Sequence, residues 1–120
     1  QRGDMIFKET RYSPLQVGSL LSVFGIIFYQ NRQDYLLCPD GGPLWAPACL
    51  FSVTDSTLSE QMHFSLLTNN GDYYWLVKDF KAVAMIGYRK LIESPQHFAG
   101  LLEREEEDLI YFYKHVRRTP

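Results

Sequence analysis

The chain has 120 residues, of which 46% are apolar and 22% charged, values that fit one globular domain and exclude a disordered chain. Its net charge of −2 at pH 7 is too small to draw the chain to nucleic acid or to an anionic membrane. Nucleic-acid binding is therefore not expected.

A single domain is expected over residues 13–120, behind a flexible segment at residues 1–12 in which residues 1–4 are an added or cropped end. The longest apolar run, residues 17–29, covers about 13 residues, whereas a membrane-spanning helix needs about 20. We therefore expect no membrane span, and we expect the chain to be cytoplasmic.

The first predicted element is a helix over residues 14–24. Ser13 and Pro14 form a start signal, because a serine caps the first turn and a proline fits its first position. Apolar residues recur at helical spacing up to Phe24, and Gly25 is a typical residue just beyond a helix end. The sequence therefore predicts an N-terminal helix.

The middle of the chain is predicted to form short strands. The β-branched and aromatic residues at 26–29 and the apolar residues at 35–38 indicate two strands joined by a polar turn. Residues 39–47 hold three prolines and indicate a loop that carries Trp45. A third strand is predicted over residues 48–53.

Residues 62–78 contain the strongest local signal, two apolar-rich runs on either side of Asn70 and Gly71. This pair favours a tight hairpin turn, whose central residues need a positive φ. A hairpin centred there would supply the fourth and fifth strands. Its pairing would place on one face Phe64, Leu66, Tyr73, Trp75 and Val77, and on the other His63, Ser65, Tyr74 and Lys78.

Two segments near the C-terminus are predicted to be helical. Residues 80–92 fit either a strand buried on both faces or a helix capped by Asp79, and their composition favours the helix. Ser94 and Pro95 repeat the start signal. The apolar stripe that follows predicts one long amphipathic helix over residues 95–117.

The fold class that these elements predict is α+β. We expect an antiparallel sheet of five or six strands, with the N-terminal helix and the long C-terminal helix packed on one face. The helices are expected to cover the face that carries Phe64 and Trp75. The opposite face of the hairpin would then be open, as antiparallel sheets tolerate.

Glu105 is the acidic residue that the helical wheel places within the apolar stripe of the last helix. One interpretation is a buried acid of raised pKa that lines a ligand-binding or enzymatic pocket between helix and sheet. The other, which we favour, is a long side chain that reaches solvent or pairs with a neighbour. The acidic run 103–108 is interpreted as a solvated helix face, and no metal site is expected.

The sequence contains no catalytic motif that we recognise. His63, His97 and His115 form no constellation, and neither zinc-hydrolase spacing, a nucleophile elbow nor a phosphate-binding loop is present. Cys38 and Cys49 form either one disulfide bridge or two buried thiols, of which the thiols are favoured. A protein that is not an enzyme and needs no cofactor is the favoured reading.

The favoured function is a small non-catalytic protein–protein interaction module: an inhibitor, an immunity-type protein, an adaptor or an assembly subunit. Tyrosine-rich patches are typical of interfaces, and a tryptophan held by flanking prolines is a typical anchor. The partner would be another protein or a second copy of the chain, and the alternative is the pocket around Glu105. Trp45 could equally close its own core. The predicted partner-binding residues are Leu44, Trp45, His63, Ser65, Tyr74 and Lys78.

Overall fold

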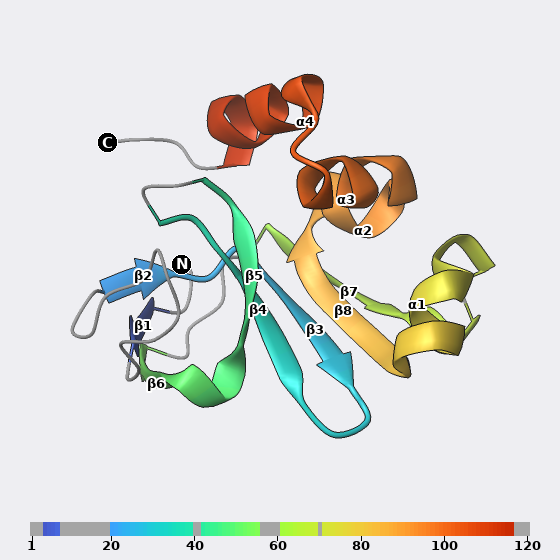
Figure 1. The fold of residues 1–120 in the computed structure, drawn as a ribbon, viewed down its shortest axis with the longest axis horizontal. Helices are drawn as coiled ribbons and strands as arrows, with labels where there is room; N and C mark the ends of the chain where they lie inside the picture. The colour runs from blue at the N-terminus through green and yellow to red at the C-terminus, as the bar shows by residue number, and fades with distance from the viewer. Residues whose placement is uncertain (1–3, 8–19, 40–41, 56–60, 70, 117–120) are drawn as a thin grey trace.

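Two antiparallel sheets and a group of short helices make up the fold in the computed structural model (Figure 1). The structure describes residues 4–7, 20–39, 42–55, 61–69 and 71–116. The small sheet has the strand order β2-β1-β6, with bounds Leu20–Ser22, Asp4–Phe7 and Phe51–Asp55. The large sheet has the order β5-β4-β3-β8-β7, with bounds Leu44–Pro47, Gln33–Leu37, Gly25–Tyr29, Ala82–Tyr88 and Met62–Leu66.

The helices are short, and most of them follow β8 in the chain. Their bounds are Tyr74–Phe80 for α1, Arg89–Glu93 for α2, Pro95–Leu102 for α3 and Glu106–Tyr111 for α4, which continues into a π-helical turn at Phe112–Val116. Single 3-10 turns lie at Ala48–Leu50, Leu67–Asn69 and Gly71–Tyr73. No helix in the described part of the chain is long and apolar enough to cross a membrane.

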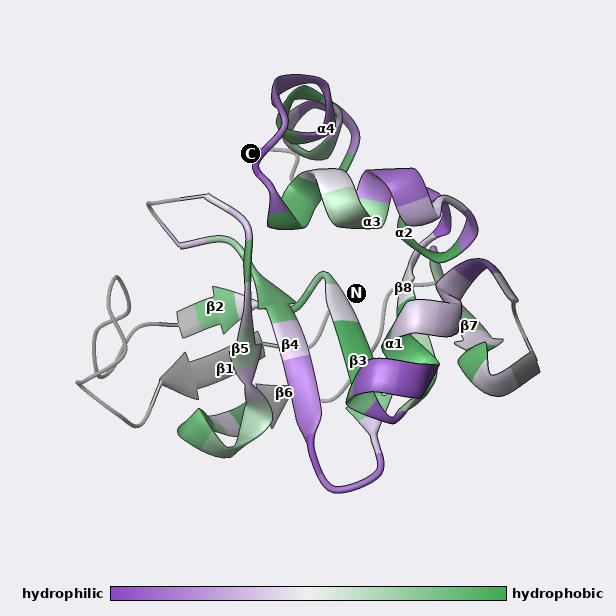
Figure 2. Ribbon diagram, turned by 45° about the vertical axis from the view of Figure 1, so that its right-hand side comes forward, coloured by the Kyte–Doolittle hydropathy of each residue, from purple (hydrophilic) through white to green (hydrophobic). Residues whose placement is uncertain are grey.

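The large sheet separates two apolar cores. Side chains alternate along its strands, so Leu36 packs under the helices while its neighbours Tyr35 and Leu37 pack toward the small sheet. The helix-side core also contains Phe98 and Phe112. Figure 2 shows hydrophobic residues along β3 and hydrophilic residues at the turn between β3 and β4.

The predicted strands at 26–29 and 35–38 are confirmed as β3 and β4, but the N-terminal helix is wrong where the structure describes it. Residues 20–22 form β2, and the remainder of that helix prediction, up to residue 19, lies outside the described residues. The reason is visible in the burial of two consecutive residues. Val23 packs in the core beside the small sheet and Phe24 in the core beneath the helices, which an extended chain allows and one face of a helix does not.

The loop predicted over residues 39–47 is partly a strand. Its second half forms β5, which pairs with β4 through Leu44 opposite Leu37 and Pro47 opposite Asp34. A proline is tolerated here because β5 is an edge strand, where one row of backbone groups needs no partner in the sheet. The strand predicted over 48–53 is confirmed in its second half as β6, which begins at Phe51 after a 3-10 turn.

The hairpin predicted around Asn70 and Gly71 is wrong. Its first strand exists as β7, but β7 ends at Leu66 and pairs with β8, and residues 74–80 form α1 instead of a returning strand. Asn70 itself lies outside the described residues. Packing decides the outcome, because Tyr73 is fully buried and its hydroxyl donates a hydrogen bond to the Leu91 carbonyl.

The helix favoured over residues 80–92 is also wrong, and the alternative of a strand buried on both faces describes most of the segment. β8 is a central strand between β3 and β7, its side chains are buried or half-buried, and its sequence is a nearly continuous apolar run. Gly87 lies opposite Gly25 of β3, and Leu91 of α2 packs over the pair. A Cβ at Gly87 would lie 2.6 Å from Leu91 Cδ2, so this close approach needs glycine.

The helix predicted over residues 95–117 begins at the predicted residue but is interrupted, so that two helices, α3 and α4, replace it. Ser94 caps α3, with its Oγ accepting a hydrogen bond from the His97 N–H at 3.1 Å. The chain then breaks at Arg104, which has a positive φ of 58°, and its guanidinium donates to the Pro43 carbonyl at 3.0 Å. Glu105 follows the break as the N-cap residue of α4 and is exposed, so the prediction that it lies within an apolar stripe is wrong.

A test of the local backbone is available at Lys81, which ends α1 in a left-handed conformation with φ 63°. This conformation is strained for every residue with a Cβ, so Lys81→Gly should raise the free energy of unfolding by about 1 kcal/mol. Lys78→Gly, inside the same helix, should lower it by about 1 kcal/mol. Urea unfolding of both variants measures the difference, and a loss of stability in Lys81→Gly would contradict the assignment.

Candidate functional site

Apart from tyrosines and Cys38, His97 is the only buried polar side chain among the described residues, with 1% of its surface exposed. It lies in the first turn of α3, and Phe98 and Leu101 of the same helix are buried as well. A buried imidazole needs hydrogen bonds at both ring nitrogens, because an unpaired polar atom in the core lowers stability by about 1–3 kcal/mol. The partners of His97 therefore define a site.

Both ring nitrogens of His97 are bonded, and the two partners come from different elements. The Nδ1 atom lies 2.8 Å from Oδ1 of Asp108 in α4, and the Nε2 atom lies 2.7 Å from the hydroxyl oxygen of Tyr88 at the end of β8. Burial raises the pKa of the Tyr88 hydroxyl, and the nearby Tyr111 and Asp108 raise it further, so the hydroxyl keeps its proton. We therefore assign Tyr88 as donor to Nε2 and Nδ1–H as donor to the Asp108 carboxylate.

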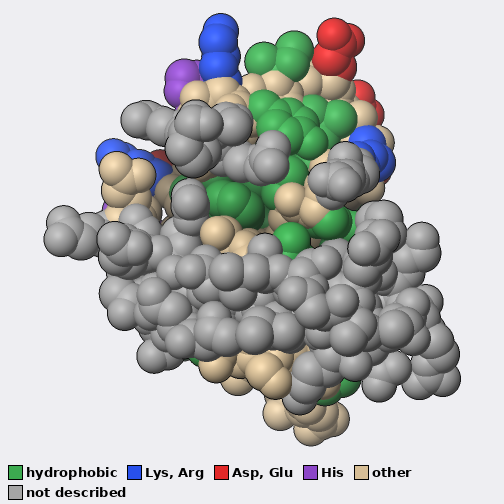
Figure 3. Space-filling model, turned by 90° about the vertical axis from the view of Figure 1, so that its left-hand side faces the viewer, with side chains coloured by type: hydrophobic (Ala, Val, Ile, Leu, Met, Phe, Trp, Pro, Cys, Tyr) green, Lys and Arg blue, Asp and Glu red, His purple; other side chains and the backbone are tan. Residues whose placement is uncertain are grey.

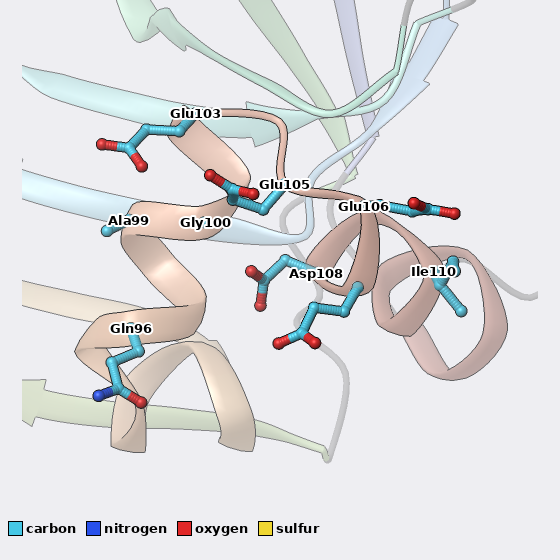
Figure 4. Close-up of a pocket in the computed structure, with 9 residues that line it drawn as sticks. Gln96, Ala99, Gly100, Glu103, Glu105, Glu106, Asp108 and Ile110 are labelled. Carbon is cyan, nitrogen blue, oxygen red and sulfur yellow. The ribbon is translucent and has the colours of Figure 1, made fainter.

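Gly100 makes room for this arrangement. A Cβ at Gly100 would overlap Oδ2 of Asp108, so any larger residue would push the carboxylate away from α3. Figure 4 shows the Asp108 side chain directed from α4 toward α3, where Gly100 lies. The missing side chain at Gly100 thus leaves space on α3 for the Asp108 carboxylate, which lies within hydrogen-bond distance of His97.

The charge state of His97 depends on two opposing effects, its burial and the neighbouring Asp108 carboxylate. Burial lowers the pKa of the imidazole, while the hydrogen bond and the negative charge of Asp108 oppose the shift and Lys90 adds to it. The net direction is downward, so His97 is neutral at pH 7. The site is then a neutral imidazole between a protonated phenol and a carboxylate.

This chain of hydrogen bonds has the order of groups found in many acid–base catalysts, but its geometry suits a structural role. A general base must reach a substrate with a free lone pair, whereas Nε2 of His97 already accepts a hydrogen bond and the ring is buried. The hydroxyl of Tyr88 has a raised pKa and is a poor nucleophile at pH 7. What the three groups do is fasten β8, α3 and α4 to one another.

An open groove of about 690 Å³ lies next to this site, between α3 and α4. Five of its nine lining residues are acidic, namely Glu103, Glu105, Glu106, Glu107 and Asp108, and the others include Ala99, Gly100 and Ile110. Figure 4 shows Glu103 and Glu106 pointing away from each other, and no group of His, Cys, Asp and Glu in the described residues is placed to hold a metal ion. Glu105 therefore lines a groove between two helices, and not the predicted pocket between helix and sheet.

The predicted partner-binding residues do not form one surface. Leu44 and Trp45 lie in β5, at the opposite edge of the large sheet from His63 and Ser65 in β7. Trp45 is half-buried and packs on the helix-side core, with its ring 5.6 Å from the ring of Phe98. This packing favours the alternative in which Trp45 closes its own core.

The other two predicted residues are on a helix. Tyr74 and Lys78 lie on the exposed side of α1, with Lys78 Nζ 5.7 Å from the centre of the Tyr74 ring. They share no strand with His63 or Ser65, so the open polar face that the hairpin predicted does not exist.

A different part of β7 is open. Phe64 and Leu66 are 61% and 48% exposed. They lie opposite Ile86 and Ala84 of β8, and Ile86 lies opposite Ile26 of β3, which packs toward the small sheet. Figure 1 shows the small sheet at the β5 side of the large sheet, away from β7. The small sheet therefore covers this apolar face at the β5 end, and no described element covers Phe64 and Leu66, which lie on the face that the helices were predicted to cover.

A second apolar surface lies on the C-terminal helices. Leu109, Ile110 and Tyr113 line a shallow groove with Arg104, Glu106 and Lys114 at its margin. In Figure 3, hydrophobic side chains gather toward the top, the level at which Figure 1 has α4, with basic and acidic side chains beside them. The described residues do not connect this surface to β7.

Both cysteines are free thiols, as favoured from the sequence. The expectation that both are buried is half right, since Cys38 is buried and Cys49 is exposed. Cys38 Sγ lies 3.9 Å from the Tyr113 hydroxyl oxygen, so this thiol packs where β4 ends beneath the π-helical turn.

Sequence reasoning missed the Tyr88, His97 and Asp108 site because its members are scattered. His97 precedes Asp108 by 11 residues and follows Tyr88 by 9, spacings that match no local motif. The available signal was a histidine in the first turn of a predicted helix, directly before Phe98 of its apolar stripe. Comparison with protein families, with curated proteins and with solved structures gave no match, so the site is interpreted from its geometry.

The fit between Gly100 and Asp108 can be tested by adding one methyl group. Alanine normally stabilises a helix interior by about 1 kcal/mol over glycine, but Gly100→Ala should lower the free energy of unfolding by about 2 kcal/mol or more, because it displaces the carboxylate from His97. In the Asp108→Ala background the same change should be close to neutral. Urea unfolding of the four proteins gives the coupling energy, and additive effects would contradict the contact.

The buried imidazole should also make stability depend on pH. Its pKa is lowered in the folded state, so the unfolded chain binds more protons, and stability should fall as pH falls below about 6.5, the pKa of an unperturbed histidine. His97→Gln should flatten the loss of melting temperature between about pH 7 and pH 5. His63→Gln, which changes an exposed histidine, is the matched control. If the melting temperature falls equally with pH in the wild type and both variants, His97 is not the group that makes stability depend on pH.

Proposed function

We propose that the chain is a non-catalytic protein–protein interaction module that docks its partner on the exposed apolar side of β7. The observation that carries the proposal is the exposure of Phe64 and Leu66, 61% and 48%, on one face of an edge strand. Large apolar side chains grouped at the surface mark interaction sites, because water contact with them is unfavourable. Inhibitor, immunity-type, adaptor and assembly roles all use such a surface.

The character of β7 supports protein docking over ligand binding. The strand reads Met62, His63, Phe64, Ser65 and Leu66, so it has no acidic residue, lysine, arginine or proline. An aromatic ring and aliphatic side chains on a flat strand match the composition of interface centres. Phe64 and Leu66 are 61% and 48% exposed on one face of a strand, whereas sites for small molecules are concave and enclose their ligands.

The enzymatic alternative has weaker support. The Tyr88, His97 and Asp108 groups are all engaged with one another, and burial keeps Tyr88 protonated. Glu105 is exposed beside other carboxylates of the acidic groove. No described group combines access to solvent with an activated proton or lone pair, so we do not assign a reaction to the groove.

The proposal predicts that binding and stability respond separately to changes in β7. Phe64→Ser combined with Leu66→Ser should change the free energy of unfolding by no more than about 1 kcal/mol, since both side chains are exposed, and should abolish capture of the partner. The measurement is quantitative mass spectrometry of proteins retained from the lysate of the source organism. Val53→Ser removes another exposed apolar residue, on β6, and should leave capture intact.

Two results would count against docking on β7. One is a set of retained proteins that is the same for the wild type and the double variant. The other is a double variant that unfolds, which would place Phe64 and Leu66 in the core and remove the observation that carries the proposal.

A further inference from the structure

We propose that the partner taken up by β7 is a second copy of this chain, paired antiparallel along the β7 edge with Phe64 opposite Phe64. This inference rests on the proposed docking surface and names its occupant. It starts from strand order, since β7 ends the large sheet and pairs only with β8 among the described residues. Its outer edge therefore presents backbone N–H and C=O groups that another strand can pair.

The two edges of the large sheet differ in how they are protected. β5, at one edge, contains Pro47 and follows Pro43, and proline blocks pairing because it has no N–H to donate. β7, at the other edge, has no proline and no lysine or carboxylate to repel an incoming strand. Proteins protect edges that must stay single, so the unprotected edge is the one suited to pairing.

The sequence of β7 is complementary to itself in the antiparallel direction. With Phe64 on the two-fold axis, Met62 of one copy lies opposite Leu66 of the other, and His63 lies opposite Ser65. Apolar side chains thus meet apolar ones on one face, and polar side chains meet polar ones on the other. No pair brings like charges together at neutral pH.

The alternative registers are poorer. Centring the pair on Ser65 or on His63 keeps the faces matched but leaves residues of each strand without an opposite partner. Centring on His63 also sets two imidazoles against each other, which repel when protonated. The register centred on Phe64 is the one that pairs the whole strand.

The axis of such a pair runs perpendicular to the sheet, so the bare faces of both copies lie on the same side. The cross-strand contacts of Phe64 with Phe64 and of Leu66 with Met62 then cover part of the apolar surface that each copy exposes, and the two large sheets become one continuous sheet. A strand of this length is about 17 Å long, and an interface of that size is small. We therefore expect a weak dimer, in exchange with the monomer.

Sedimentation equilibrium of the wild-type chain tests the inference directly. The mass should rise from the monomer value of 14.0 kDa toward twice that value as the concentration increases to about 1 mM. Phe64→Lys places two ammonium groups on the axis and should keep the chain monomeric throughout. Val53→Lys adds the same charge on an exposed strand position of the small sheet and should leave the self-association of the wild type unchanged.

A cross-link reports the register. In a Cys49→Ser background, Phe64→Cys should form an interchain disulfide on mild oxidation, because directly opposite Cα atoms in an antiparallel pair are about 4.5–5.5 Å apart, within disulfide range. Val53→Cys in the same background should cross-link at least about tenfold more slowly, by random collision alone.

Three outcomes separate this inference from the function on which it rests. A wild-type chain that stays at the monomer mass to about 1 mM, or a dimer that persists in Phe64→Lys, overturns the second copy as occupant. If capture of a different protein is then lost in the Phe64 and Leu66 double variant, the docking surface stands and only its occupant changes. If that capture is also unaffected, both proposals fall.

Discussion

The hydrogen bonds of one buried imidazole decide how the C-terminal part of the chain is arranged. In a continuous helix, Asp108 would lie about 16 Å along the axis from His97, because each residue adds about 1.5 Å. The observed distance between Nδ1 and Oδ1 is 2.8 Å. The chain must therefore turn back between the two residues. The break at Arg104, with its positive φ, supplies that reversal.

The same constraint explains why an acidic run sits where it does. Once α4 folds back against α3, Asp108 is the member of the run that enters the contact, and Gly100 is the residue that admits it. The remaining acidic residues stay in solvent along the groove. Glu106 and Glu107 lie in the first turn of α4, where negative charge is favourable near the N-terminal end of a helix. Their clustering thus follows from the turn and does not require a ligand.

The sequence predicted the fold where local signals and packing agree. The strands at 26–29 and 35–38 and the cap at Ser94 are confirmed, because β-branched content and cap chemistry act within a few residues. The hairpin at residues 62–78 and the helix at 80–92 are wrong, because long-range pairing of β7 with β8 outweighed a turn preference and a composition preference. A short apolar run cannot show by itself whether it is enclosed on both faces.

The site was less predictable than the fold. The contact between His97 and Asp108 can be predicted only if the last helix is known to be broken. The apolar spacing of residues 95–117 is equally compatible with one continuous helix. The exposure of Phe64 and Leu66 could likewise not be predicted from the sequence, because it depends on where the small sheet lies. Phenylalanine is a typical core residue, but Phe64 lies at the edge of the large sheet away from the core beside the small sheet and is exposed.

The fastening site and the proposed docking strand are parts of one mechanical arrangement. Tyr88, which donates to His97, ends β8 and lies opposite Met62, the first residue of β7. β7 pairs with no other described strand, so its place in the sheet depends on its pairing with β8. A strand that offers its edge to a partner costs less to pair when it is already held in place, because the ordering entropy has been lost during folding. The buried imidazole therefore holds the end of β8, and with it the first residue of the proposed docking strand.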